Sequence, residues 1–499
     1  RALTLFQRLA DDFPDEPDHR FDLTKCHANL ANLLAGQGRW EEAETEYRSG
    51  LGVQAKLVAD YPSDPKYRSL LGQCHVSFGL LLNKLGRRPE AEAEYRRAVA
   101  ILEKLTDAPS PPEFLVNLAQ SQANLGEFLK AGGDLAGAEE RHRKGLAVWE
   151  MLAADLPGVP QYRDDLAKCH SHLGMLLGML GRQADAEQHH LRGVELGGRL
   201  AADFPTVPVY QKNLAFSHNA LGNFYTNVGQ RNKAEAQFRS ALAVMGKLAD
   251  EFPADPDIRE RLAATHGDLG VQLNGLGKRE EATEHTRRAV ANTEKLVADF
   301  PAVPLYRRNL VAGRFNLMFL LLLDGKKAEA EKEYRAALAV CERLVADYRD
   351  VTQYRSDLAT ALNLHGVMLS DAGDHATAEK DLNRAIALIQ QLIKDEPRVP
   401  QHHRILGDAL TNRSRARASL GSVLSAASDL TAAAKAQTNA LQLDPLASGE
   451  HIRRSGSNMA DMYGPDQKGS PNPATAPRIT PRESLPPPKR EVLPAPRRE

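Results

Sequence analysis

Histidine and cysteine are the residues whose types and spacing could support metal chemistry in this sequence. Cys169, His170 and His172 lie within four positions, and His189 and His190 follow further along the chain. Imidazole and thiolate groups are the usual ligands of structural zinc. None of these spacings matches a known ligand set, and helix residues two positions apart do not face each other. We therefore expect no metal site and no cofactor.

A further set of histidines recurs at one phase of a long sequence period: His27, His75, His170, His218 and His266. On stacked helices, successive copies would lie roughly 10 Å apart. A metal ion binds its ligands at about 2 Å, so these copies cannot share one ion. We expect packing or hydrogen-bonding roles for them.

No arrangement typical of an enzyme is present. The sequence lacks a phosphate-binding P-loop, a dinucleotide-binding glycine fingerprint and an ordered Ser/His/Asp set. The recurring "EAExxYRRA" charges place glutamate and arginine three to four residues apart, which suits a solvated helix face. We expect no catalytic residue and no enzymatic activity within these residues.

The elements that must position any binding site are set by a repeat. A motif such as Asp-Phe-Pro recurs every 48 residues, with one unit of 47. Nine units result, which end at 444 and begin at residues 14, 62, 109, 157, 205, 253, 301, 349 and 397. We number them units 1 to 9. Residues 1–13 read as the tail of a preceding repeat helix, so we expect the chain to be part of a longer protein.

Three positions hold one residue type in all nine units: Leu nine residues after the unit start, Gly after 24 and Ala after 29. About twenty residues with apolar positions at helical spacing precede that glycine. The glycine suits a left-handed helix C-cap, after which a second helix runs to the next proline. Each unit is therefore predicted to be a helix hairpin that buries its apolar faces against its neighbours. A glycine within a helix, such as Gly222, is predicted to mark a close crossing.

Unit 5 shows the pattern of the hairpin most clearly: His218-x-x-Leu221-Gly222-x-x-Tyr225, then Ala234, Phe238 and Ala241. This pattern resembles the tetratricopeptide repeat, although the family repeat has about 34 residues. The resemblance covers residues 1 to 444. It implies an all-α fold, a right-handed superhelical solenoid of antiparallel helix pairs. HEAT-like repeats have a comparable length but do not require Leu-Gly, turn Gly and Ala at these offsets.

The tetratricopeptide family lines a concave groove with the first helix of each pair. Carrying those positions over gives a predicted groove set: Met175, Met179, Phe216, Asn223, Val271, Phe315, Phe319, Leu322 and Val367. An exposed apolar surface of this kind marks an interaction site. The alternative is that "RFNLMFLLLLDG" is a more buried helix, covered by a neighbour or a second copy.

The unit signature "LVADFPAVPLYRRNL" is also similar to arrays in large bacterial proteins, notably planctomycete ones. Many of those proteins carry a serine/threonine kinase domain ahead of the array. No glycine-rich strand loop, His-Arg-Asp loop or Asp-Phe-Gly motif occurs in this sequence. The resemblance implies an alternative role as the regulatory or substrate-docking arm of a larger kinase whose catalytic domain lies upstream of Arg1.

Composition excludes several other classes. The net charge is -1 at pH 7, with basic and acidic residues interleaved, which argues against a nucleic-acid partner. The longest apolar run, Leu317 to Leu323, is too short to span a membrane. Four cysteines without a CxxC pair argue against a disulfide framework. These features predict a cytoplasmic protein.

The sequence changes character after unit 9. Residues 445–463 are expected to form a polar capping helix, which terminal repeats need. Ten of the 36 residues in 464–499 are proline, so this tail is expected to be disordered. It is either a plain tail or a ligand for a proline-recognising module.

The combined prediction is a non-enzymatic scaffold that binds protein or peptide partners through its concave face. Self-association is compatible with this role. A purely structural spacer is the remaining alternative. It predicts a polar groove throughout, which units 4 to 7 do not favour.

Overall fold

The computed structural model of the chain describes residues 1–37, 39–106, 110–349 and 351–443. The expected capping helix (445–463) and proline-rich tail (464–499) lie outside the described residues, as does the turn glycine Gly38. The described residues form α-helices joined by short turns, and the all-α prediction is confirmed.

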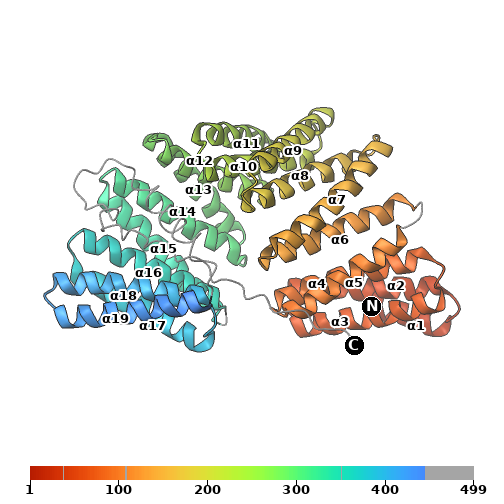
Figure 1. Cartoon of the computed structure of the whole chain (residues 1–499), viewed down its shortest axis with the longest axis horizontal. Coiled ribbons are helices and arrows are strands. Elements are labelled where there is room, and N and C mark those ends of the chain that lie inside the picture. Colours follow the sequence, from red (N-terminus) through yellow and green to blue (C-terminus); the bar gives the residue numbers. More distant parts are fainter. Residues whose placement is uncertain (38, 107–109, 350, 444–499) are drawn as a thin grey trace, which may run out of the picture. The chain divides into compact units, whose positions relative to one another are not determined.

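The helices follow one another as antiparallel pairs in chain order (Figure 1). A short helix, α1 (Ala2–Asp12), precedes the pairs. The first helices are α2 (Pro17–Gly36), α4 (Pro65–Lys84), α6 (Pro112–Ala131), α8 (Pro160–Met179), α10 (Pro208–Asn227), α12 (Pro256–Gly275), α14 (Pro304–Leu323), α16 (Thr352–Asp371) and α18 (Pro400–Ser419). The second helices are α3 (Trp40–Asp60), α5 (Arg88–Leu105), α7 (Leu135–Asp155), α9 (Gln183–Asp203), α11 (Arg231–Glu251), α13 (Arg279–Asp299), α15 (Lys327–Asp347), α17 (His375–Asp395) and α19 (Val423–Leu443).

Proline and glycine set the limits of the first helices. All first helices except α16 begin with a proline, whose missing N–H is no loss in the first helical turn. The glycine after each first helix has a positive φ in the eight units where it is described, for example 76° at Gly229. Residues with a side chain rarely adopt this conformation, which explains why the position holds only glycine.

The Asp-Phe-Pro motif joins one unit to the next. The carboxylate of Asp203 accepts a hydrogen bond from Nη1 of Arg163 at 2.9 Å, which ties the end of α9 to α8. The ring of Phe204 meets Tyr210 of α10 edge to face, with ring centroids 5.7 Å apart. Equivalent ion pairs recur as Arg20–Asp60, Arg259–Asp299, Arg307–Asp347 and Arg355–Asp395. In these five units the motif therefore links the end of the second helix to the first helix of the same hairpin.

The largest apolar cluster spans several successive units. Leu173, Leu221 and Leu269 occupy one repeat position and are fully buried within the same apolar cluster. Polar contacts also link successive units: Nζ of Lys278 lies 2.8 Å from Glu235, and Arg182 lies 2.6 Å from Glu139. Contacts with its neighbours therefore contribute to the stability of each unit, as in other repeat proteins.

Candidate functional site

The predicted groove set lies entirely on first helices, from α8 to α16. Met179 and Val271 are about half exposed, at 47% and 50% of their surface, and Asn223 is exposed. The other six side chains are partly buried. A partner could therefore reach some of each side chain, and the binding role of the set stays a prediction.

The segment "RFNLMFLLLLDG" on helix α14 was predicted to be either a partner-binding surface or a buried helix. Each of the two predictions applies to a different face of the helix. Leu317, Met318 and Leu321 are buried and pack in a core cluster with Tyr334 of α15. Phe315 packs against the same cluster but is only partly buried. The helix therefore supplies core on one side and accessible apolar surface on another.

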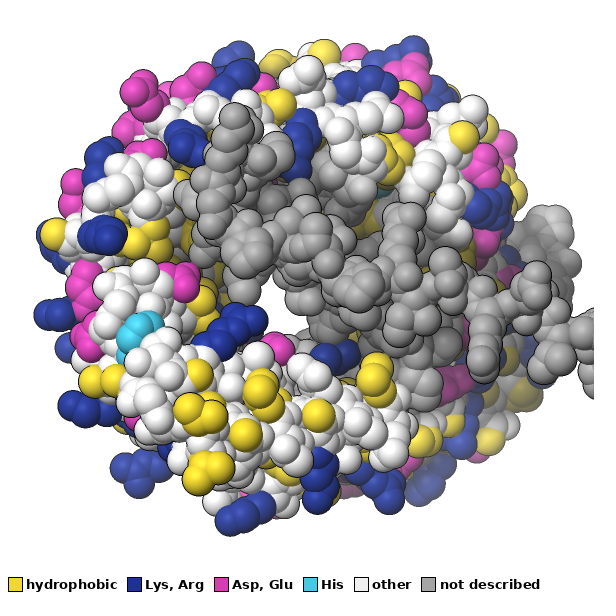
Figure 2. All heavy atoms as spheres, turned by 60° about the vertical axis from the view of Figure 1, so that its left-hand side comes forward, with side chains coloured by type: hydrophobic (Ala, Val, Ile, Leu, Met, Phe, Trp, Pro, Cys, Tyr) yellow, Lys and Arg dark blue, Asp and Glu magenta, His cyan; other side chains and the backbone are white. Residues whose placement is uncertain are grey.

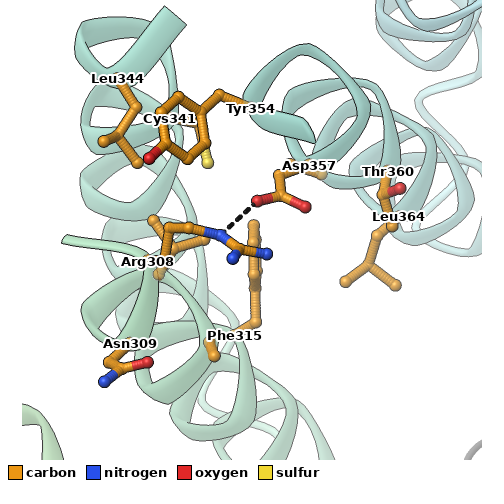
Figure 3. A pocket seen from close by; sticks show the side chains of 12 residues that line it. Arg308, Asn309, Phe315, Cys341, Leu344, Tyr354, Asp357, Thr360 and Leu364 are labelled. Atoms are coloured by element: carbon orange, nitrogen blue, oxygen red, sulfur yellow. Dashed lines mark hydrogen bonds and ion pairs between the residues drawn. The ribbon is translucent and has the colours of Figure 1, made fainter. Parts of the chain in front are cut away.

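A pocket of about 360 Å³ lies between α14, α15 and α16, where units 7 and 8 meet (Figure 3). Its lining includes Arg308 and Phe315 of α14, Cys341 and Leu344 of α15, and Asp357 and Leu364 of α16. Among the predicted groove set, Phe315 is the member that lines this pocket. The other members lie along neighbouring first helices or on other turns of α14 and α16.

Arg308 and Asp357 form an ion pair in the pocket, with Cys341 and Leu344 on one side of it and Phe315 on the other (Figure 3). The Nε of Arg308 donates to Oδ2 of Asp357 at 2.8 Å, and Oδ1 of Asp357 accepts from Nε2 of Gln353, also at 2.8 Å. Asp357 is thus fixed from its own helix and orients the guanidinium group. No hydrogen bond joins the two terminal amino groups of Arg308 to any side chain or backbone group in the described part of the chain.

The junction of units 5 and 6 differs from this one at two repeat positions. Where units 5 and 6 meet, Nδ2 of Asn219 donates to Oγ1 of Thr265 at 2.8 Å and links the two first helices. The same two repeat positions hold Phe315 and Ala361 where units 7 and 8 meet. A phenyl ring cannot make this polar link, and alanine is too small to fill the space beside it.

The pocket holds one thiol and one ion pair. Burial raises the pKa of the Cys341 thiol to about 12, so it is protonated at neutral pH and is a poor nucleophile. Arg308 and Asp357 neutralise each other in part and offer directional hydrogen bonding. Sequence reasoning did not single out this pair. The available signal was the apolar residue Phe315 at a position that holds a polar residue in units 4, 5, 8 and 9.

A second polar group lies where units 3 and 4 meet. Oε1 of Glu127 lies 3.1 Å from Nδ1 of His172 and 3.3 Å from Nε2 of His142, and Oε2 lies 2.5 Å from Nζ of Lys130. Burial opposes ionisation of Glu127, but these donors outweigh it and hold the pKa of its carboxyl well below the usual range. The ring of Phe216, from the predicted groove set, packs against His172 with centroids 5.6 Å apart.

The histidines that recur at one repeat phase each pair with a residue on the second helix of the same unit. The five pairs are His27–Glu46, His75–Glu94, His170–His189, His218–Gln237 and His266–His285. These contacts agree with the hydrogen-bonding role expected for them. Aligning the units by phase places the partners in one column, which is the sequence signal for the pairing.

The residues considered for metal binding contact separate partners. Sγ of Cys169 donates to the carbonyl oxygen of His142 at 3.7 Å, whereas His172 contacts Glu127. Over residues 1–37, 39–106, 110–349 and 351–443, no group of three or more His, Cys, Asp or Glu side chains is arranged to hold a metal ion.

The outer surface carries charges of both signs. On the face seen in Figure 2, lysine and arginine side chains alternate with aspartate and glutamate, and hydrophobic side chains lie among them. Among the helices that are described, none is both long and apolar enough to cross a membrane.

The paired helices, the glycine-closed turns and the shared core define the described chain as an all-α, tetratricopeptide-like solenoid. Residues 25–49 match the family described as "Tetratricopeptide repeat". They comprise most of α2, the following turn and the start of α3.

Several solved structures are similar to this chain. RapI in its apo form is 13% identical, with a TM-score of 0.47, over 83% of this chain and 98% of RapI. BtubC (BKLC) from P. vanneervenii is 19% identical, with a TM-score of 0.41, over 53% of this chain and 93% of BtubC. A signal transduction ATPase with a tetratricopeptide repeat sensor, from Pyrococcus horikoshii, is 11% identical, with a TM-score of 0.46, over 82% of this chain and 54% of that protein. No curated protein sequence matches the chain.

Proposed function

We propose that this chain is a protein-binding scaffold, with no catalysis of its own, that holds partner peptides against the first helices of units 4 to 8. The observation that carries the proposal is the run of accessible apolar side chains on consecutive first helices, from Met175 to Val367, beside a preformed pocket. Apolar side chains left accessible on a folded array are typical of interaction surfaces. The proposed surface is carried over from the first-helix positions that line the concave face in the tetratricopeptide family.

A peptide library displayed on phage tests the proposal, because it samples many candidate partner sequences at once. The chain is immobilised, enriched peptides are synthesised, and their affinities are measured by isothermal titration calorimetry. The double variant Met179→Glu with Val271→Glu changes two half-exposed side chains on α8 and α12. We expect it to weaken the selected peptides about tenfold or more, since each charge must be desolvated on binding.

Leu191→Glu is the matched control. Leu191 is 47% exposed, like Met179, but it lies on the second helix α9 and outside the predicted groove set. We expect this variant to bind the selected peptides as the unchanged chain does. Light scattering on all variants shows whether self-association competes for the same surface. Failure to enrich any peptide, or equal loss in the control, would refute the proposal.

The role as a docking arm of a serine/threonine kinase is a finer version of the same proposal. It depends on the resemblance of the unit signature alone, and no contact among the described residues favours it. It makes one distinct prediction, that kinase substrates are among the bound partners.

A further inference from the structure

The pocket where units 7 and 8 meet has a charged end and an apolar end. Arg308 and Asp357 lie seven residues before Phe315 and Leu364, on α14 and α16. Both are first helices of antiparallel pairs and therefore run in the same direction. Arg308 and Asp357 thus lie at the same level along the two helices. An α-helix rises about 1.5 Å per residue, which separates the two ends by about 10 Å.

At the charged end, the guanidinium group of Arg308 is more accessible to a ligand than the carboxylate of Asp357. Each oxygen of Asp357 already accepts a hydrogen bond, one from Arg308 and one from Gln353. The guanidinium group uses only its Nε, and its terminal amino groups meet no acceptor in the described residues. Two parallel N–H donors of a guanidinium group match the geometry of a carboxylate. A ligand carboxylate would therefore complete the set of contacts around Arg308.

At the apolar end, the pocket offers carbon surface. Phe315 and Leu364 line this end, whereas Cys341 and Leu344 line the wall nearer to Arg308 (Figure 3). A large aliphatic or aromatic side chain gains the most by leaving water for such an environment. The volume of about 360 Å³ accommodates one such side chain and part of a peptide backbone.

We propose that this pocket binds an extended partner peptide in which an acidic side chain lies two residues from a large apolar side chain. In an extended peptide, residues i and i+2 point to the same side and are about 7 Å apart. The length of the two side chains covers the rest of the distance between the pocket ends. The proposal deepens the proposed function and rests on it, because it assigns a ligand chemistry to one part of the same surface.

The test uses short peptides that isolate the carboxylate. Acetylated and amidated Ala-Glu-Ala-Phe-Ala is compared with the same peptide carrying Gln in place of Glu, by saturation-transfer NMR and calorimetry. We expect the Glu peptide to bind about tenfold more tightly, because a charge-assisted pair replaces a neutral one. A third peptide, acetyl-Ala-Ala-Ala-Phe with a free carboxyl terminus, asks whether a chain end can supply the carboxylate. We expect it to bind more weakly, because its carboxylate is adjacent to the aromatic residue.

Two pocket variants assign the effect to Arg308. Arg308→Gln is expected to abolish the difference between the Glu and Gln peptides. Asp357→Asn keeps the guanidinium group and removes the competing carboxylate, so it is expected to preserve or strengthen binding of the Glu peptide. Lys212→Gln is the control, since Lys212 forms a comparable ion pair with Asp257 at 2.8 Å between other units. Circular dichroism checks that every variant is folded.

The outcomes separate this proposal from the broader one. Equal binding of the Glu and Gln peptides, tighter binding of the free-acid peptide, or equal loss in Lys212→Gln overturns the pocket chemistry. Absence of binding by all three peptides also overturns it. In any of these cases, peptides enriched from the display library and weakened by Met179→Glu with Val271→Glu would leave the scaffold function standing.

Discussion

The phenyl ring of Phe238 on α11 lies directly against the backbone of Gly222 on α10. A Cβ atom at residue 222 would stand 2.8 Å from Cε1 of that ring, closer than real Cβ contacts. The prediction that Gly222 marks a close crossing is confirmed, and the partner is an aromatic ring. The same arrangement recurs between Gly174 and the ring of His190.

Replacing Gly222 by alanine is expected to destabilise the array. Alanine in a helix interior gains about 1 kcal/mol over glycine. Overpacking of a well-filled site costs about 1–3 kcal/mol, and a rigid ring cannot move aside as a flexible chain end could. We expect the free energy of unfolding to fall by about 1 kcal/mol in Gly222→Ala, measured by urea denaturation and by hydrogen exchange in α10 and α11.

Gly246 provides the control for this prediction. It lies within α11, and nothing stands within 4 Å of the position where its Cβ would be. Gly246→Ala is expected to raise the free energy of unfolding by up to about 1 kcal/mol, because alanine has the higher helix propensity and meets no steric clash here. The double variant Gly222→Ala with Phe238→Ala should lose less than the sum of the single changes. Stabilisation by Gly222→Ala alone would show that the ring does not restrict this position.

Much of the fold could be predicted from the sequence because a local physical rule repeats nine times. Gly229 and its equivalents hold a backbone conformation that other residues avoid, and Pro208 and its equivalents begin helices. A position constrained by backbone geometry leaves the same signature in every unit. The helix pairs and their order followed from that signature.

The pocket could not be predicted in the same way, because it comes from a departure from the repeat. The two positions of Arg308 and Asp357 are also linked at other junctions, by Asp164 with Asn213 and by Glu260 with Asn309, so the repeat marks a contact here but not this pair of residue types. Phe315 was identified as an apolar residue on a first helix, but its neighbour Ala361 was not. The structure shows that both residues line the same pocket, which the sequence alone does not indicate.

Acid is expected to destabilise the array through buried neutral histidines. His190 is fully buried, neither ring nitrogen has a hydrogen-bond partner among the described residues, and its ring lies over Gly174. Burial, with a smaller effect of nearby His189, lowers the pKa of His190 from 6.5 to about 4. The unfolded chain therefore binds more protons between these values. The free energy of unfolding should fall as the pH decreases from 6.5 towards 4, by at most about 3 kcal/mol for this group.

The variant His190→Phe isolates this contribution. Phe238 occupies the same position in unit 5, so a phenyl ring is compatible with a glycine beneath it. Urea denaturation at pH 7.5 measures the change in packing, and the same experiment at pH 5 adds the cost of protonation. We expect the loss of stability between the two pH values to be smaller in His190→Phe than in the unchanged chain. Identical losses would show that His190 is not the titrating group.

The last described unit depends on one buried carboxylate. Asp429 of α19 accepts hydrogen bonds from Nε and Nη2 of Arg413, at 2.9 and 2.5 Å, and from Nη1 of Arg417 at 3.1 Å. Asp429 is buried, and both arginines are mostly shielded from solvent. Removing one partner of a buried ion pair leaves an uncompensated charge in a poorly solvated place. Because repeat units couple mainly to their neighbours, the effect should remain near α17 to α19.

Asp429→Ala is therefore expected to lower the local free energy of unfolding by about 3 kcal/mol. This value is at the low end of the range for buried ion pairs, because Arg417 keeps its contact with Glu379. Hydrogen exchange measured by mass spectrometry should accelerate in α18 and α19 and stay unchanged in α2 to α9. Glu284→Ala on α13 is the control, since Glu284 pairs with Arg288 on an exposed surface and should contribute less than about 1 kcal/mol. If exchange in α18 and α19 responds to both changes equally, the buried carboxylate does not hold the last helix pair together.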